Sequence, residues 1–256
     1  MITSTTNKQI KMIQKLQKSS KERKQQGLFT IEGIRMFREI PAEYMDKVYV
    51  TEQFYEKNKE LFKDREPDDF VAESVFEKLS ETQTPQGVLA TVKMRRYTLA
   101  DVLGVTENPL LLVLENLQDP GNLGTIMRTA EGAGASGIIM SRDTVDIYNP
   151  KVVRSTMGAL FRMPFLYVED ILETVKDLQD RGITVYAAHL QGEGFYEKDY
   201  RKGTAFLVGN EGNGLTDAIT ELADEKIRIP MMGKVESLNA AIAATLMAYE
   251  ALRQRL

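Results

Sequence analysis

The 256-residue sequence contains no cysteine and a single histidine, His189. The absence of cysteine excludes disulfide bonds, thiolate zinc sites and a cysteine nucleophile. A metal site built from several imidazoles is also excluded, so no metal is expected. Long apolar runs are missing too, because stretches such as Leu110–Leu114 are far shorter than a membrane span. The amino terminus lacks the apolar stretch of a signal peptide, so we expect a cytoplasmic protein without membrane attachment.

Positive and negative side chains nearly balance over the whole chain, but they are unevenly distributed along it. The formal net charge is −4 and the pI is about 5.4, which by itself argues against a nucleic-acid partner. Residues 1–98 nevertheless carry 18 basic and 15 acidic residues, whereas the remainder carries 15 basic and 22 acidic ones. Residues 1–24 alone hold seven basic residues and one acid, Glu22. Such a basic amino-terminal arm indicates either a polyanionic partner or simply a solvated helix face. The basic residues at its start are Lys8, Lys11, Lys15, Lys18, Lys21, Arg23 and Lys24.

Strand and helix patterns alternate along the chain. Residues 5–19 repeat apolar side chains at helical spacing, and short β-rich runs follow at 47–51, 70–72 and 87–92. From residue 110 onward the predicted strands are almost continuously apolar, as in parallel strands buried on both faces. These strands cover 110–115, 137–140, 182–188, 204–208 and 226–229, and the predicted helices cover 123–133, 150–158, 171–181, 215–222 and 238–254.

The fold class is therefore α/β, with two domains. A small α/β domain is predicted for residues 1–96, and a linker for residues 97–108. A second domain with a mostly parallel, doubly wound sheet is predicted for residues 109–256, because its strands alternate with helices.

Gly132, Gly134 and Gly137 form a G-x-G-x-x-G pattern. This pattern binds a dinucleotide only where it follows a strand and opens a helix. Here it closes a predicted helix and precedes a strand, so the favoured interpretation is a helix cap. A nicotinamide-dependent dehydrogenase remains as the alternative.

Three polar segments follow predicted strands of the second domain. The first carries Asn122 and, six residues later, Arg128. The second places Glu211 between glycines, and the third places Ser237 where the N-cap of a helix is expected. Ligands of open α/β sheets bind at the carboxyl ends of the strands. Each segment alone could be a structural turn, but together they predict a composite ligand site.

These segments carry a family resemblance. The ordered motifs are N-x-G-x-x-x-R-T-A at 122–130, L-V-G-N-E-G-x-G-L at 207–215 and I-P-M…S-L-N-A-A-I-A-A at 229–244. With KVVRSTMGALFRMP at 151–164, they resemble the SpoU, or TrmH-type, branch of the SPOUT RNA methyltransferases. Residues 1–95, with RKQQGLFTIEG at 23–33, resemble the RNA-binding domain of that family, which is similar to a ribosomal-protein α/β fold.

The resemblance implies a fold and an activity. It implies a carboxyl-terminal α/β domain with a deep trefoil knot, which is a rare exception to the rule against knotted chains. It also implies S-adenosylmethionine as cofactor, a homodimer, and methyl transfer to a ribose 2′-hydroxyl of RNA. We favour 23S ribosomal RNA as the substrate, with transfer RNA as the second possibility. A non-catalytic RNA-binding or ribosome-assembly factor with the same fold is the alternative from another class.

The resemblance also assigns roles to particular residues. Arg128 matches the catalytic arginine of the family, and Asn122, Glu211, Ser237 and Asn239 match residues that order its loops and position the acceptor ribose. The predicted cofactor-binding residues are Gly209, Asn210, Ile229, Met231 and Leu238. The predicted RNA contacts are the seven cations named above together with Arg35 and with Arg154, the latter supplied by the partner subunit.

Simpler structural roles are open for several of these residues. Arg128 could form a helix-surface ion pair with Glu131 or Glu115. Ile229 and Leu238 could be core residues only, and Ser237 could be a helix cap only.

The chemistry is compatible with this composition. Methyl transfer from a sulfonium needs neither a metal nor an enzyme nucleophile, and positioning can supply much of the rate enhancement. A guanidinium has no free lone pair to accept a proton, so Arg128 is a poor general base. We expect it instead to hold an RNA phosphate and to stabilise the developing alkoxide.

Overall fold

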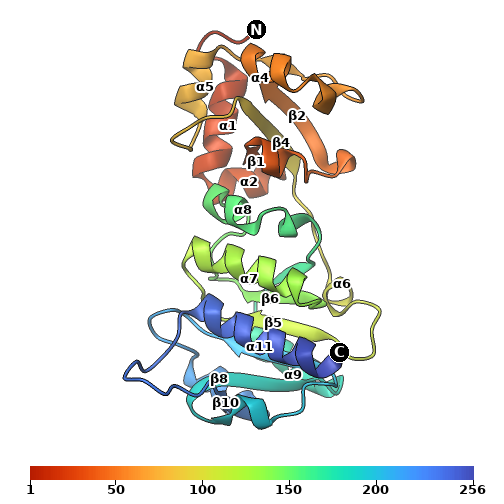
Figure 1. Ribbon diagram of the computed structural model, residues 1–256, viewed down its shortest axis with the longest axis vertical. Coiled ribbons are helices and arrows are strands. Elements are labelled where there is room, and N and C mark those ends of the chain that lie inside the picture. The colour runs from red at the N-terminus through yellow and green to blue at the C-terminus, as the bar shows by residue number, and fades with distance from the viewer. The chain divides into compact units, whose positions relative to one another are not determined.

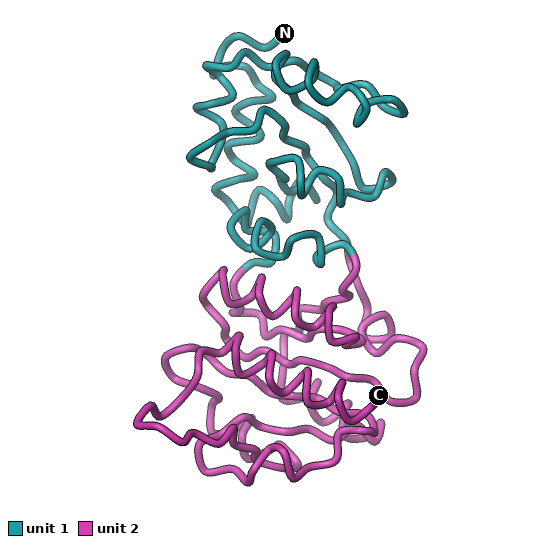
Figure 2. Tube along the Cα trace, viewed as in Figure 1, with its two compact units in different colours: residues 1–95, 146–161 teal, residues 96–145, 162–256 magenta.

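A computed structural model describes residues 1–256, which divide into two compact units. Unit 1 comprises residues 1–95 and 146–161, and unit 2 comprises residues 96–145 and 162–256 (Figure 2). This division differs from the predicted boundaries in two places. The predicted linker folds as part of unit 2, and residues 146–161 of the predicted second domain fold as part of unit 1.

Unit 1 contains a four-stranded mixed sheet in the order β1-β4-β2-β3. Figure 1 labels β1, β4 and β2 of this sheet. Strand β4 is antiparallel to β1 and β2, and β3 is parallel to β2. The strands are β1 (Leu28–Glu32), β2 (Met45–Val50), β3 (Asp69–Phe70) and β4 (Val88–Lys93). The helices are α1 (Lys8–Lys18), α2 (Ser20–Gln26), α3 (Ile34–Phe37), α4 (Glu52–Lys57), α5 (Glu73–Leu79) and α8 (Pro150–Thr156), with 3-10 turns η1 (Ala42–Tyr44), η2 (Lys59–Phe62) and η3 (Ala159–Phe161).

Helix α1 forms where the apolar periodicity predicted a helix. Ile10, Ile13 and Leu16 are buried, and the lysines of this helix are exposed. The helix begins after Asn7, whose side chain accepts a hydrogen bond from the amide of Gln9 at 2.8 Å. Burial of one face leaves the cationic face of α1 to solvent.

Unit 2 contains a six-stranded, entirely parallel sheet in the order β10-β8-β9-β5-β6-β7. Its strands are β5 (Leu110–Leu114), β6 (Gly137–Ser141), β7 (Phe165–Val168), β8 (Thr184–Gly194), β9 (Thr204–Val208) and β10 (Glu225–Arg228). Its helices are α6 (Leu99–Leu103), α7 (Pro120–Gly132), α9 (Ile171–Asp180), α10 (Asp217–Leu222) and α11 (Ala240–Arg255), with the 3-10 turn η4 (Phe195–Glu197). Every residue of β5, β6 and β9 is buried, which confirms the prediction of a doubly covered parallel sheet.

The strand order has a switch point between β5 and β9. On one side of β5 lie β6 and then β7, which come next along the chain. On the other side of β5 lies β9, and beyond it β8 and then β10. Helices α7 and α11 pack against each other (Figure 1). Helix α11 also packs on β5 and β9. The loops that follow β5 and β9 therefore meet at the carboxyl edge of the sheet, where open α/β sheets bind ligands.

The G-x-G-x-x-G segment ends α7 and opens β6, which confirms the helix-cap interpretation. Gly134 has a φ of +68°, a conformation that favours glycine. A Cβ atom on Gly137 would lie 2.5 Å from the side chain of Val102 in α6, so this glycine permits close packing.

Some elements were not predicted. Strand β7 and helices α4 and α5 are short, and β8 extends six residues beyond its predicted end, to Gly194, with a register shift against β10. No helix has the length and apolar character needed to cross a membrane. No three His, Asp or Glu side chains are grouped in a way that could hold a metal ion.

Candidate active site

The loops after β5 and β9 are tied together by partly buried side-chain hydrogen bonds. Glu115, which is only 5% exposed, accepts hydrogen bonds from the amide and the hydroxyl of Thr216, both at 2.8 Å. The side-chain amide of Asn210 donates to the carbonyl oxygen of Asn116 at 2.9 Å. The two loops thus form one rigid edge at the switch point of the sheet.

The glycine-rich loop after β9 is shaped by Gly209 and Asn210. A Cβ atom on Gly209 would lie 2.1 Å from the carbonyl carbon of Gly214, so only glycine allows the loop to close. Asn210 exchanges two backbone hydrogen bonds with Gly214, and its side-chain oxygen accepts from the amides of Gly212 and Asn213. Both predicted cofactor residues therefore also shape the loop that presents Glu211.

Glu211 accepts hydrogen bonds from three donors of the neighbouring loop. Its carboxylate accepts from the amides of Gln118 at 3.0 Å and Asp119 at 2.8 Å, and from the side-chain amide of Asn122 at 2.9 Å. Burial alone would raise the pKa of Glu211, but the hydrogen bonds from Asn122 and from these backbone amides outweigh it and leave the pKa below its ordinary value. The carboxylate is thus ionised at neutral pH and acts as an acceptor.

Asn122 extends this network to the third predicted segment. Its side-chain oxygen accepts a hydrogen bond from the side-chain amide of Asn239 at 2.9 Å. Asn239 is the N-cap of α11, because its side-chain oxygen accepts from the amides of Ala241 and Ile242. The structure therefore brings Asn122, Glu211 and Asn239 together, as the sequence predicted.

The prediction that Ser237 caps this helix is wrong. Helix α11 begins at Ala240, and Asn239 already satisfies its first amides. Ser237 lies two residues before the cap, is exposed, and has no side-chain hydrogen bond within the chain. Its hydroxyl is therefore free to meet a ligand.

Arg128 is exposed on α7 and forms no hydrogen bond or ion pair within the chain. The two partners considered for it are already engaged. Glu131 pairs with Arg162 at 2.7 Å, and Glu115 binds Thr216, so the interpretation of Arg128 as a surface ion pair is wrong. Six residues separate it from Asn122, about 9 Å along the helix axis. A free guanidinium thus lies on the helix that the Asn122 network anchors.

Residues 229–238 form no hydrogen bond through their backbone. Ile229, Met231 and Leu238 are half-buried in this segment, so they are not simply core residues. Open space also surrounds Gly233, where a Cβ atom would meet nothing within 4 Å. Aliphatic walls with unused backbone donors and acceptors are the components of a pocket for a planar heteroaromatic ligand.

The predicted RNA-binding cations of unit 1 fall into two groups. Arg23 is buried, with 3% of its side chain exposed, and forms an ion pair with Asp146 at 2.6 Å. Its assignment as an RNA contact is therefore wrong, because the side chain is already satisfied in the interior. The exposed residues are Lys8, Lys11, Lys15, Lys18, Lys21, Lys24 and Arg35.

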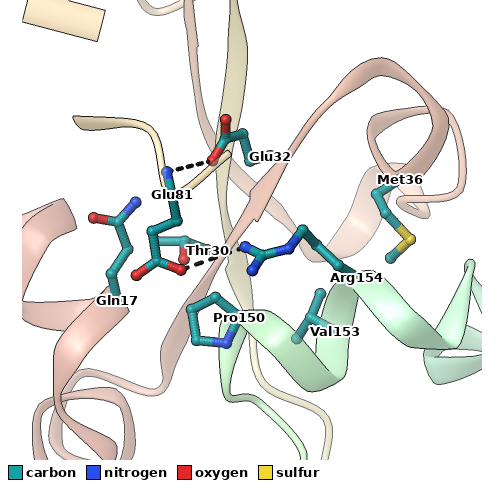
Figure 3. Close-up of a pocket in the computed structure, with 8 residues that line it drawn as sticks. All are labelled: Gln17, Thr30, Glu32, Met36, Glu81, Pro150, Val153 and Arg154. Carbon is teal, nitrogen blue, oxygen red and sulfur yellow. Dashed lines mark hydrogen bonds and ion pairs between the residues drawn. The ribbon is translucent and has the colours of Figure 1, made fainter. Parts of the chain in front are cut away.

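Arg154 belongs to α8 and lies in a small pocket of unit 1. Its guanidinium pairs with Glu81 at 3.4 Å, and the backbone amide of Glu81 donates to Glu32 (Figure 3). Pro150 and Val153 of the same helix line this pocket. A third of the Arg154 side chain, 34%, remains exposed to solvent beside this contact.

Sequence reasoning missed the residues that hold the loop after β5. Asn116 adopts a φ of +54°, and its side-chain oxygen accepts from the hydroxyl of Ser141 at 3.0 Å. The side-chain amide of Gln118 donates to the carbonyl oxygen of Asp143 at 2.7 Å. The one available signal was an asparagine directly after a buried strand, since asparagine tolerates the left-handed region.

Comparisons with known proteins cover both units. Residues 109–249 match the SpoU rRNA Methylase family, and residues 7–90 match the MRM3-like substrate binding domain. The chain is 35% identical to an uncharacterized tRNA/rRNA methyltransferase of Synechocystis sp., over 99% of this chain and 94% of that protein. It is 32% identical to the 23S rRNA (guanosine(2553)-2′-O)-methyltransferase RlmP of Bacillus subtilis, over 97% of each.

Among solved structures, the chain is similar to the SpoU methyltransferase AviRb of Streptomyces viridochromogenes in complex with the cofactor AdoMet. The TM-score is 0.88 at 31% identity, and the match covers 97% of this chain and 98% of that one. The similarity therefore extends over both units rather than the parallel sheet alone.

Proposed function

Because the chain belongs to the SpoU rRNA methylase family, we propose that it transfers a methyl group from S-adenosylmethionine to a ribose 2′-hydroxyl of 23S ribosomal RNA. One observation carries the proposal. Arg128 has no partner within the chain, and it projects from the helix whose start is fixed by the hydrogen bonds among Asn122, Glu211 and Asn239. A cation without an internal partner is available to an anionic substrate.

The residues at the sheet edge fit the cofactor. S-adenosylmethionine, when bound, supplies a methyl group on a sulfonium. Residues 229–238 offer backbone groups that make no internal hydrogen bond, and Ile229, Met231 and Leu238 offer apolar walls for an adenine. Gly209 and Asn210 hold the facing loop in shape. No metal ligand is needed from the chain.

Arg128 acts on the RNA side of the reaction. Its guanidinium stays charged, so it holds a backbone phosphate of the RNA and stabilises the alkoxide that develops on the ribose. The hydroxyl proton passes to the phosphate or to water. Glu211 and Asn122 act through the loops that they order, and Ser237 and Asn239 orient the segment that positions the acceptor ribose.

The exposed lysines of α1 and α2 provide the proposed RNA-binding surface of unit 1. Lys8, Lys11, Lys15 and Lys18 follow the spacing of one helical face and lie opposite the buried side chains of α1. Lysine on such a face attracts phosphate without reading sequence. Lys21, Lys24 and Arg35 extend this cationic surface.

The exposed face of α11 supports a homodimer. Ile242 is 51% exposed and Tyr249 is 47% exposed, seven residues apart on one face of the helix. Large apolar side chains at this spacing are typical of a helix that packs against a partner, and we propose a second copy of this chain. Sedimentation of the wild type and of Ile242→Lys tests this, because a charge at that face should yield monomers.

Two further properties accompany the proposal. We propose that residues 229–239 thread through the loop of the knot that the family resemblance implies. We also propose that the protein works in the cytoplasm, where ribosomal RNA is modified. Limited proteolysis with intact-mass analysis and cell fractionation test these two points.

The experiment that tests the function is methyl transfer with labelled S-adenosylmethionine. The purified protein is incubated with transcripts of 23S rRNA or with transfer RNA, and the position of the label is mapped. We expect one 2′-O-methylated ribose in 23S rRNA and none in transfer RNA. Label found only in transfer RNA would show that transfer RNA, the second possibility, is the substrate.

Calorimetry separates the remaining classes. If the protein binds RNA but neither binds nor consumes S-adenosylmethionine, it is a non-catalytic assembly factor. Binding of a nicotinamide dinucleotide without binding of S-adenosylmethionine would instead indicate a dehydrogenase, which the position of the three glycines disfavours.

A further inference from the structure

The loop after β6 holds the active-site loop of unit 2. The amide of Val145 donates to the carbonyl oxygen of Leu117 at 2.8 Å, and the amide of Asn116 donates to the hydroxyl of Ser141 at 2.8 Å. Gln118, whose own amide donates to Glu211, is also held by its side chain to Asp143. Any displacement of residues 141–145 therefore acts on the loop that positions Glu211.

The next residue along the chain, Asp146, belongs to unit 1. Its Oδ2 accepts hydrogen bonds from Nε of Arg23 at 3.0 Å and from Nη2 at 2.6 Å. Its Oδ1 accepts from the amide of Tyr148 at 3.0 Å. The side chains are 3% and 18% exposed for Arg23 and Asp146. The peptide bond between Val145 and Asp146 thus joins the segment that holds the active-site loop to the ion pair of Asp146 with Arg23.

Arg23 also holds the helix that carries the exposed lysines. Its Nη1 donates to the carbonyl oxygens of Leu16 at 2.6 Å and Gln17 at 3.2 Å, in the last turn of α1. One guanidinium therefore fixes the end of α1 to Asp146 in a defined geometry. Because Arg23 lies inside unit 1, it cannot itself be an RNA contact.

The segment after Asp146 is anchored in unit 1 at further points. The rings of Tyr148 and Phe29 lie 4.6 Å apart, and the hydroxyl of Tyr148 accepts from the amide of Arg95 at 2.8 Å. Helix α8 contributes the pair between Arg154 and Glu81 (Figure 3). Residues 146–161 are thus fixed to the same body as α1, and the chain leaves that body for the active site at Val145.

We propose that the Arg23–Asp146 ion pair is a positioning link, through which RNA held by the lysines of α1 fixes the loop of Leu117–Asp119 for catalysis. This inference rests on the proposed RNA methyltransferase function. Arg23 and Asp146 touch neither the RNA nor the reacting atoms. They act through Val145, whose amide holds Leu117, and through the adjacent amides that hold Glu211.

The test is a comparison of Asp146→Asn with the wild type on a 23S rRNA transcript. Asparagine keeps an oxygen for the amide of Tyr148 but removes the charge that binds Arg23. We expect kcat per cofactor-binding site to fall at least tenfold, while KM for RNA and the Kd of S-adenosylmethionine change less than twofold. A merely structural role would instead lower the number of cofactor-binding sites.

Asp68→Asn is the matched control. Asp68 also lies in unit 1, where it pairs with Arg65 at 3.1 Å and accepts from the amide of Val48 at 2.8 Å. It has no contact with residues 146–161. We expect its kcat to stay within twofold of the wild type. A fall in kcat equal to that of Asp146→Asn would overturn the link.

Arg23→Met and the double variant with Asp146→Asn test whether the two residues act through each other. The double variant should be no slower than the slower single variant, because the second change removes an interaction that is already lost. If the two single reductions in kcat multiply in the double variant, the residues act independently, which would contradict the proposal.

Hydrogen exchange gives a further readout, the change in amide protection on RNA binding, which is compared with and without RNA within each variant. Binding of the transcript to the wild type should slow exchange of the amides of Val145 and Asp119, and Asp146→Asn should abolish this protection. Unchanged exchange in the wild type, or an unchanged kcat in Asp146→Asn, overturns the inference while leaving the proposed function intact. Failure of the wild type to methylate any RNA overturns the proposed function instead.

Discussion

Two arginines, one in each unit, show how differently the same side chain is used. Arg23 is almost fully buried and directs its nitrogens at Asp146 and at two carbonyl oxygens of α1. Arg128 is exposed, and no acid within the chain binds it. The interior of unit 1 therefore uses its arginine for architecture, whereas the edge of the parallel sheet leaves its arginine free for a substrate.

The difference lies in the neighbouring acids rather than in the arginines. Near α7, Glu131 is engaged by Arg162, Glu211 by amide groups and Glu115 by Thr216. The acidic side chains near α7 are thus already bound to other groups and do not pair with Arg128. A guanidinium in such surroundings keeps its charge available, which is the property that a phosphate or an alkoxide requires.

Arg128→Ala should show the largest effect of any single substitution on activity. Losing a donor to developing negative charge costs on the order of 10²- to 10³-fold in kcat. The free energy of unfolding should change by less than about 0.5 kcal/mol, because the side chain has no partner to lose. Single-turnover methylation and denaturant unfolding measure the two quantities, with Arg181→Ala, an exposed residue of unit 2 that pairs with Asp177, as the control.

Arg23→Ala should instead lower the free energy of unfolding, in addition to its effect on kcat. Breaking a buried ion pair leaves the carboxylate of Asp146 uncompensated and costs about 3–5 kcal/mol of unfolding free energy. The matched Arg65→Ala removes an exposed pair with Asp68 and should cost no more than about 1 kcal/mol. Urea unfolding measures both free energies. If Arg23→Ala and Arg65→Ala lose the same unfolding free energy, Arg23 has no special structural role.

Glu211→Gln should lower activity by an intermediate amount, about tenfold. A glutamine oxygen replaces only one of the two acceptors, so at least one of the three donors loses its partner. Because folding lowers the pKa of Glu211, its carboxylate stabilises the fold above the ordinary value of 4.5, and this stabilisation is lost as the pH falls below that value. The stability advantage of the wild type over Glu211→Gln should therefore shrink between pH 7 and pH 4. An advantage that grows on acidification would contradict the assignment.

The exposed lysines should show the smallest effect on catalysis. Lys11→Ala with Lys15→Ala should weaken RNA binding several-fold and lower kcat by less than Asp146→Asn does, because the remaining exposed cations still hold the RNA. The slope of log affinity against log salt should fall by about 1.4, since each lost contact to single-stranded RNA contributes about 0.7. Lys57→Ala with Lys63→Ala removes two exposed lysines outside α1 and serves as the control. An unchanged salt slope in the α1 variant would show that this face of unit 1 does not meet the RNA.

The sequence predicted the parallel sheet and the composite site well, because both depend on local patterns. The strands predicted at 110–115, 137–140 and 204–208 correspond to the buried strands β5, β6 and β9, and the polar motifs after β5 and β9 converge at one edge. Asn122, Glu211 and Asn239 were predicted as a group, and the structure joins them by hydrogen bonds. Strand β7 was not predicted, although its four residues match the length of β10.

The sequence could not distinguish the roles that depend on distant partners. Arg23 stands among exposed lysines, and only its contact with Asp146, 123 residues further on, removes it from the surface. Likewise, residues 146–161 follow a strand of the second domain, and nothing in their own pattern indicates that they fold with the first unit. Ser237 and Asn239 are both good cap residues, and the choice between them depended on Asn122.

The most direct test is to map 2′-O-methylation across 23S rRNA and transfer RNA in cells that carry the wild-type chain, Arg128→Ala, or no copy. We expect one ribose of 23S rRNA that is methylated with the wild type and unmethylated in the other two strains, with equal levels of folded wild-type and Arg128→Ala protein. Full methylation of that ribose with Arg128→Ala would contradict the assignment of the free arginine to catalysis.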